Sequence, residues 1–98
     1  GVPPGQALIV VNNGFDWPIR FTLDQRYRVE VGPSEYDLNP GESISLVVWP
    51  GQLAFSASSP WNELSGMTEM TLAEDEARTL WVTFIPDPGE PGNWVMMF

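Results

Sequence analysis

The sequence contains no cysteine, no histidine and no lysine among its 98 residues. Without these side chains the chain cannot build a Ser-His-Asp or Cys-His nucleophile system, a Schiff-base lysine, or a zinc site of thiolates and imidazoles. A P-loop is excluded because it requires lysine, and the chain has no Gly-x-Gly-x-x-Gly motif either. We therefore expect that the protein is not an enzyme.

Carboxylates are the chemically active groups that remain, and neither of their usual uses fits well. A glycosidase-like pair needs one acid held protonated by burial, whereas most acids here lie at predicted turns or on polar strand faces. The loop acids Glu74-Asp75-Glu76, Asp87 and Glu90 lack the Asp-x-Asp-x-Asp-Gly spacing of a calcium loop. We expect no catalytic residue, no metal and no other cofactor.

Positive charge is scarce and unevenly placed. Residues 1–31 hold three acids and three arginines, whereas residues 32–98 hold ten acids and only Arg78, which accounts for the whole net charge of -9. Such a surface repels phosphate backbones and anionic lipid headgroups. The longest apolar runs, residues 7–11 and 94–98, are also far shorter than the roughly 20 residues that cross a bilayer. We expect no nucleic-acid partner and no membrane insertion.

The residues that are present form short alternating segments separated by proline and glycine, as in β-sandwiches. Apolar residues alternate over 19–23 and again over 27–31, with Asp24-Gln25 between them, which predicts a β-hairpin. Residues 58–66 are rich in turn formers and predict a longer loop. The fold class is therefore expected to be all-β, an immunoglobulin-like antiparallel β-sandwich of about seven or eight strands.

The last part of the chain differs from the rest. Residues 1–85 are expected to form the sandwich domain, and residues 86–98 a Pro/Gly linker followed by an apolar C-terminal strand. Two alternatives stay open for this strand: it belongs to the same domain and pairs within its own sheet, or it is donated to a neighbouring molecule.

A set of turn motifs gives a resemblance to known modules. Val-Asn-Asn-Gly at 11–14 is followed by Leu-x-Pro-Gly-Glu-Ser at 38–43 and Pro-Gly-x-Leu-x-Phe-x-Ala at 50–57. This spacing, over residues 7–84, resembles small bacterial extracytoplasmic sandwich modules of the PEGA-like and carboxypeptidase-regulatory-like kind. The resemblance implies a non-catalytic module that is extracellular or located in the cell envelope.

The five tryptophans allow two interpretations. Trp17, Trp49 and Trp61 each neighbour a proline at a predicted loop or strand end, where carbohydrate-binding sandwiches present flat rings to sugars. Alternatively, these indoles close the ends of the core and keep their N–H groups near solvent or a carbonyl.

Strand parity predicts an apolar surface outside the core. Val47, Trp49 and Trp81 alternate out of phase with the core positions of their strands, so they face outward, and a soluble monomer rarely leaves such a patch bare. The tail or another subunit would cover it. The candidate interaction residues are Val47, Trp49, Trp81, Trp94, Val95, Met96, Met97 and Phe98.

These observations lead to a function hypothesis and an alternative. The leading hypothesis is a structural module that self-associates or docks through an exposed sheet edge and this outer face, as in a filament or surface-layer subunit. Its partners would be copies of itself or a larger surface assembly. The alternative is a carbohydrate-binding module that uses Trp17, Trp49 and Trp61 as a glycan platform.

Overall fold

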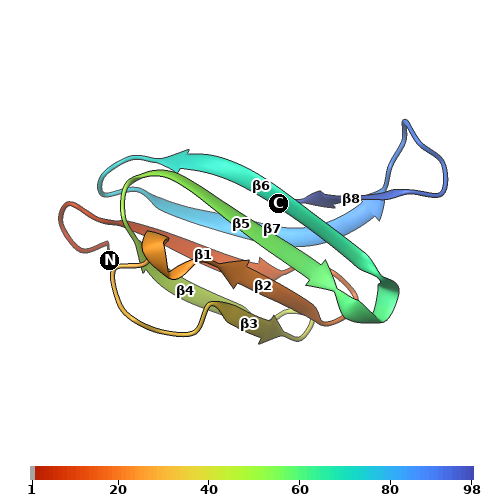
Figure 1. Cartoon of the computed structure of the whole chain (residues 1–98), viewed down its shortest axis with the longest axis horizontal. Helices are drawn as coiled ribbons and strands as arrows, with labels where there is room; N and C mark the ends of the chain where they lie inside the picture. Colours follow the sequence, from red (N-terminus) through yellow and green to blue (C-terminus); the bar gives the residue numbers. More distant parts are fainter. Residues whose placement is uncertain (1) are drawn as a thin grey trace.

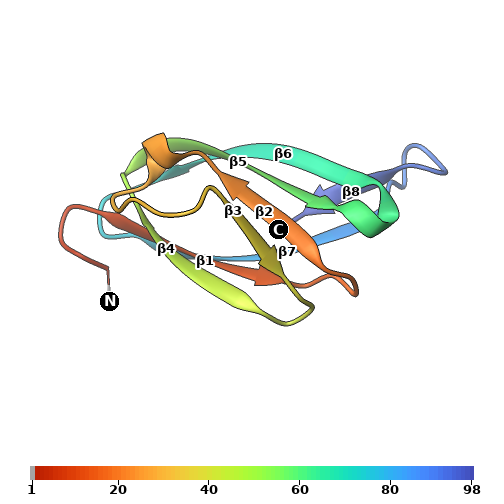
Figure 2. The same ribbon diagram turned by 60° about the horizontal axis from the view of Figure 1, so that its bottom comes forward.

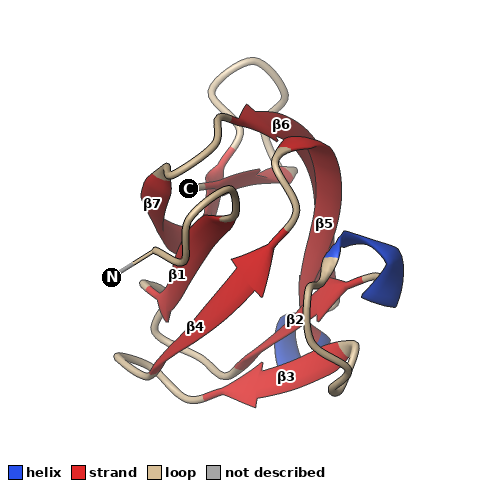
Figure 3. Ribbon diagram, turned by 90° about the vertical axis from the view of Figure 1, so that its left-hand side faces the viewer, coloured by secondary structure: helices blue, strands red, loops and turns tan. Residues whose placement is uncertain are grey.

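The computed structural model describes residues 2–98, which form two four-stranded β-sheets facing each other (Figure 1, Figure 3). Sheet I has the order β4-β1-β7-β8 and contains β1 (Ala7–Asn13), β4 (Ser43–Val48), β7 (Ala77–Pro86) and β8 (Trp94–Met97). Sheet II has the order β3-β2-β5-β6 and contains β2 (Ile19–Leu23), β3 (Glu35–Leu38), β5 (Gly51–Ser59) and β6 (Leu64–Leu72). Two short 3₁₀ turns are η1 (Gln25–Tyr27) and η2 (Pro60–Asn62).

The all-β prediction is confirmed, and the eight strands fall within the expected range. Neighbouring strands are antiparallel except for β1 and β7, which run parallel. The parallel pair joins distant parts of the chain, so it depends on long-range contacts.

The core lies between the sheets and follows the period-two alternation of the strands. In β1, Ala7, Ile9 and Val11 are fully buried, whereas the residues between them are half-buried because β4 and β7 flank this central strand. Phe21 and Phe55 meet at 5.3 Å between ring centroids. The other buried apolar residues are Ile19, Leu23, Leu38, Leu46, Val48, Leu53, Ala57, Leu72, Leu80, Val82 and Phe84.

The predicted hairpin of residues 19–23 with 27–31 is wrong. β2 pairs instead with β3, with Ile19 opposite Leu38. The Asp24 side chain accepts a hydrogen bond from the N–H of Arg26 and starts η1, so the chain turns out of the sheet. Val31 is consequently 98% exposed, although its alternation with Val29 resembled a strand.

The predicted loop over residues 58–66 is too long, because only residues 60–63 lie outside the strands. β5 continues to Ser59 and β6 begins at Leu64, and these two residues are paired across the hairpin. Ser59 is buried, where its hydroxyl donates to the carbonyl of Pro18 and accepts from the side chain of Asn62. Ser59 therefore serves as a strand residue because its buried hydroxyl has hydrogen-bond partners.

One long side of the sandwich carries the edge strands β3 and β4, and we call it the polar side (Figure 2). Asn13, which is 1% exposed, donates through Nδ2 to the carbonyls of Trp17 and Leu38, both at 2.9 Å. The segment after η1 pairs with β4: Val29 donates to the Val47 carbonyl at 3.2 Å. Hydrogen bonds thus join the two sheets along this side.

The opposite long side carries the edge strands β6 and β8, and we call it the apolar side. β8 pairs antiparallel with β7, with Thr83 opposite Met97 and Ile85 opposite Val95. Figure 1 shows β8 in dark blue beside β7, reached through the loop that projects at one end of the molecule. The C-terminal strand therefore lies at the edge of its own sheet in this structure.

Candidate interaction surfaces

The outer face of sheet I carries an exposed apolar cluster at its β7–β8 edge. Trp81 and Ile85 alternate with the buried residues of β7, so they face outward, and Val95 and Met97 lie beside them on β8. Trp81 is 59% exposed and Met97 is 47% exposed. We call these four residues, Trp81, Ile85, Val95 and Met97, the outer apolar patch.

The predicted grouping of Val47, Trp49 and Trp81 is only partly right. All three lie on the outer side of sheet I, but Val47 is opposite Leu8 in the register and Trp81 is opposite Asn12. Four residues along a strand span about 13 Å. Val47 and Trp81 therefore do not belong to one patch. The alternation of side chains predicts which face of the sheet a residue lies on, but not its position along the strand.

The predicted tail residues divide into two sets. Val95 and Met97 face outward, whereas Trp94, Met96 and Phe98 face the body of the domain. Phe98 packs edge-on against Phe55 at 5.7 Å between centroids. The tail therefore contributes both to an exposed surface and to the packing of the apolar side.

The edge strands of the two sides differ in their protection against pairing with another chain. β3 has only four residues, of which Glu35 and Asp37 carry charge, and the residues after η1 cover part of β4. β6 has nine residues with one charge, Glu69, and β8 has none. Natural proteins block edges with short strands and charges, so the apolar side has the less protected edges.

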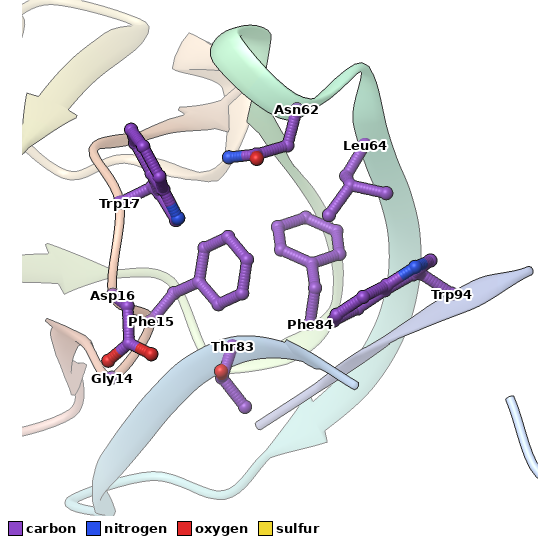
Figure 4. Close-up of a pocket in the computed structure, with 9 residues that line it drawn as sticks. All are labelled: Gly14, Phe15, Asp16, Trp17, Asn62, Leu64, Thr83, Phe84 and Trp94. Carbon is purple, nitrogen blue, oxygen red and sulfur yellow. The ribbon is translucent and has the colours of Figure 1, made fainter. Parts of the chain in front are cut away.

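A pocket of about 340 Å³ opens at the end of the sandwich where β1 is followed by the loop to β2 (Figure 4). Phe15 lies in its middle, 5.5 Å from the ring of Phe84 and 6.5 Å from that of Trp94. The indole of Trp17 forms the facing wall. The polar lining residues are Asp16, Asn62 and Thr83.

Asn13 holds the wall of this pocket in place. Its Oδ1 accepts the N–H of Phe15 at 2.8 Å, while its Nδ2 donates to the carbonyl of Trp17. The loop between β1 and β2 is therefore fixed at both aromatic residues. The sequence signal was the Asn-Asn-Gly turn, which indicated the end of a strand and not the orientation of Phe15.

The predicted glycan platform of Trp17, Trp49 and Trp61 does not exist as one surface. Trp49 follows β4 at the end where β1 begins, because Val48 pairs with Ala7. Trp17 and Trp61 lie at the other end, where Trp61 lines a second hollow with Pro18. Trp94, which was assigned to the tail, is the indole that shares a pocket with Trp17.

The acidic turn at residues 74–76 uses its carboxylates for the fold. Asp75 accepts the N–H of Gly5 at 2.9 Å, and Glu76 accepts the N–H of Ala73 at 2.8 Å and pairs with Arg78 at 2.6 Å. The Ala73 hydrogen bond and then the Arg78 guanidinium hold the pKa of Glu76 below its usual range. Within residues 2–98 no group of three or more potential metal ligands comes together.

No helix within the described part of the chain is long and apolar enough to span a membrane. No protein-family model, curated protein or solved structure matches this chain. A function therefore has to be inferred from the surfaces described above.

Proposed function

We propose that the chain is a non-catalytic structural module, extracellular or in the cell envelope, that associates with copies of itself. The observation that carries this proposal is the outer apolar patch beside β8, an edge strand without charge. Exposed apolar clusters next to an unprotected edge favour pairing with another chain. Main-chain hydrogen bonds would supply affinity, and the alternating side chains of β8 would set the register.

The proposal includes an immunoglobulin-like classification at the level of architecture. Two sheets rich in antiparallel pairs face each other, as in that class of sandwich. The strand order differs from the A-B-E-D and C-F-G order of an immunoglobulin constant domain. The likeness therefore concerns the layers and not the connectivity.

The net charge shapes how such an association would respond to salt. Each copy carries a net charge of -9, so two copies repel each other at low ionic strength. β8 itself is uncharged, and salt shortens the range of the repulsion to about 10 Å at 0.1 M. Self-association through β8 should therefore become tighter as salt is added, whereas binding to a basic partner would become weaker.

Light scattering behind a sizing column, over a wide concentration range and with negative-stain imaging, tests the proposal. We expect a concentration-dependent oligomer or polymer, and a clean monomer at every concentration would contradict it. Met97→Lys places a charge in the outer apolar patch and should weaken association through this patch roughly tenfold or more. Met67→Lys is the matched control, because Met67 is 75% exposed on the outer face of sheet II.

A second candidate function, glycan binding, is favoured by the aromatic pocket. Phe15, Trp17 and Trp94 are three aromatic side chains around one open hollow, with Asn62 and Asp16 available for sugar hydroxyls. Intrinsic fluorescence should then change with an oligosaccharide, and Trp17→Ala should abolish the change. An emission indifferent to every oligosaccharide tried would remove this candidate and leave self-association untouched.

A further inference from the structure

β8 is a short terminal segment that only one strand holds by pairing. It has four residues, all paired with β7, and its other edge has no strand partner within residues 2–98. The loop of residues 87–93 connects it to β7 and contains Pro88 and Pro91. A short edge strand on a separate loop is the kind of element that copies of a protein exchange.

The body of the domain contains a place shaped for β8. Gly66 on β6 faces Met96 so closely that a Cβ at position 66 would lie 2.7 Å from the Cβ of Met96. Phe98 packs against Phe55, which is 2% exposed. These contacts match the side chains of Met96 and Phe98, which are two residues apart on the same face of the strand.

Removal of β8 would leave an unfavourable surface behind. Phe84, now 3% exposed, would lose the cover of Met96, and β7 would become an edge strand with unpaired backbone groups. Every other copy of the chain carries the segment that restores these contacts. An exchanged β8 would therefore form the same contacts as before, at little cost in packing.

The connecting loop is a hydrogen-bonded turn that contains two prolines, and an exchange of β8 would have to open it. It is closed by the N–H of Asp87 donating to the carbonyl of Asn93 at 2.8 Å, while proline restricts neighbouring backbone towards extended conformations. Asp87 and Glu90 line an open hollow that Glu63 also borders.

We propose that copies of this chain associate by exchanging residues 94–98, with the β8 of one copy occupying the edge of sheet I in another. This inference rests on the proposed self-association and specifies its mechanism. A reciprocal exchange gives a closed dimer, and an exchange passed from copy to copy gives a filament. The partner is a second copy because the vacated place matches Met96 and Phe98 of this chain.

An engineered disulfide tests the exchange directly, since the chain has no cysteine of its own. Thr83→Cys combined with Met97→Cys places two thiols directly opposite each other across β7 and β8. The variant is refolded at high concentration under reducing conditions, separated by size and then oxidised. Exchange predicts disulfide-linked dimers or ladders on a denaturing, non-reducing gel.

The control pair is Val10→Cys with Ser45→Cys, which are opposite each other on β1 and β4 of the same sheet face. Its disulfide should stay within one chain in every assembly. Oligomers of the Thr83 and Met97 variant that contain only intrachain disulfides would overturn the exchange and leave self-association standing. A monomer at every concentration, before and after oxidation, would overturn both.

A loop deletion provides a second test that does not depend on oxidation. Deleting residues 88–93 leaves only Asp87 between Pro86 and Trp94, and a β-hairpin needs a loop of about two residues. β8 could then pair with β7 only in another chain. We expect a folded dimer or polymer even at low concentration, and a monomer, folded or unfolded, would overturn the proposal.

Discussion

The two long sides of the sandwich are held together by different interactions. On the polar side, hydrogen bonds from buried Asn13 and from the segment after η1 link the sheets. On the apolar side, the links are side-chain packing, with Met96 against Gly66 and Phe98 against Phe55. A hydrogen bond requires a particular donor and acceptor in a particular orientation. Apolar packing is not directional and requires only a complementary shape.

The proposed association uses the apolar side because its edge strands are less protected. The edges of the polar side are short, charged or partly paired, and Arg20 forms an ion pair with Asp37 at 2.9 Å across β2 and β3. The edges of the apolar side have a single charge between them, at Glu69.

Asn13→Ala should have the largest effect, because it breaks the link on the polar side. The change leaves two carbonyls and one N–H without their partner in a buried site, which should cost about 2 kcal/mol of the free energy of unfolding. Urea unfolding monitored by tryptophan fluorescence measures this. Asn12→Ala is the matched control, since Asn12 makes one hydrogen bond to the Leu80 carbonyl at 3.2 Å and should cost less than half as much. Equal effects would contradict the assignment of the link to Asn13.

Gly66→Ala should have an intermediate effect, because it disturbs the packing on the apolar side. The added Cβ would meet Met96 at 2.7 Å, so β8 must shift, and we expect a loss of about 1 kcal/mol after the gain from a stiffer unfolded chain. The loss should shrink in a Met96→Gly background. Gly89→Ala, where the added Cβ makes only ordinary contact, is the control. A loss that is unchanged by Met96→Gly would mean that the strain arises elsewhere.

The smallest predicted effect concerns pH and the turn between β6 and β7. Because the pKa of Glu76 is lowered in the folded state, its charge stabilises the fold above the usual pKa of glutamate. That contribution is lost as the pH falls below about 4.3 through the lowered pKa. Glu76→Gln should therefore reduce the loss of stability in acid, as measured by urea unfolding at several pH values.

Glu42→Gln is the matched control for this last prediction. Glu42 accepts the N–H of Asn39 at 2.7 Å in the turn between β3 and β4, as Glu76 accepts that of Ala73, but within residues 2–98 it has no arginine partner. In both turns a glutamate accepts the backbone N–H of the residue three positions earlier, but only Glu76 also pairs with an arginine. Equal changes in acid stability for both variants would contradict a specific role for Arg78.

Much of the strand content could be predicted from alternation, but pairing and some boundaries could not. The buried faces of the segments around Ile9, Leu46, Phe55 and Val82 follow directly from period two. The hairpin after Leu23 was wrongly predicted because a side-chain cap from Asp24 turns the chain away. The alternation of apolar residues in the sequence does not reveal a local side-chain hydrogen bond of this kind.

The candidate surfaces could be predicted less completely than the strands. Outward parity identified Trp81, and the apolar run identified residues 94–98, but parity missed Ile85, which follows the same parity as Trp81 immediately before Pro86. Parity also predicted one patch of Val47, Trp49 and Trp81, whereas the strand register places Val47 and Trp81 at different positions along the sheet. The role of Gly66 had no signal in the sequence, because it depends on which strand lies opposite.

The sequence by itself determined which faces are apolar and which chemistries are excluded, since both follow from residue types and a local period of two. The tertiary structure alone decided that β1 lies parallel to β7, that β8 occupies the edge of sheet I, and that Trp94 shares a pocket with Trp17. These features join residues distant in the chain. They depend on how whole strands pack together, and no local pattern encodes that.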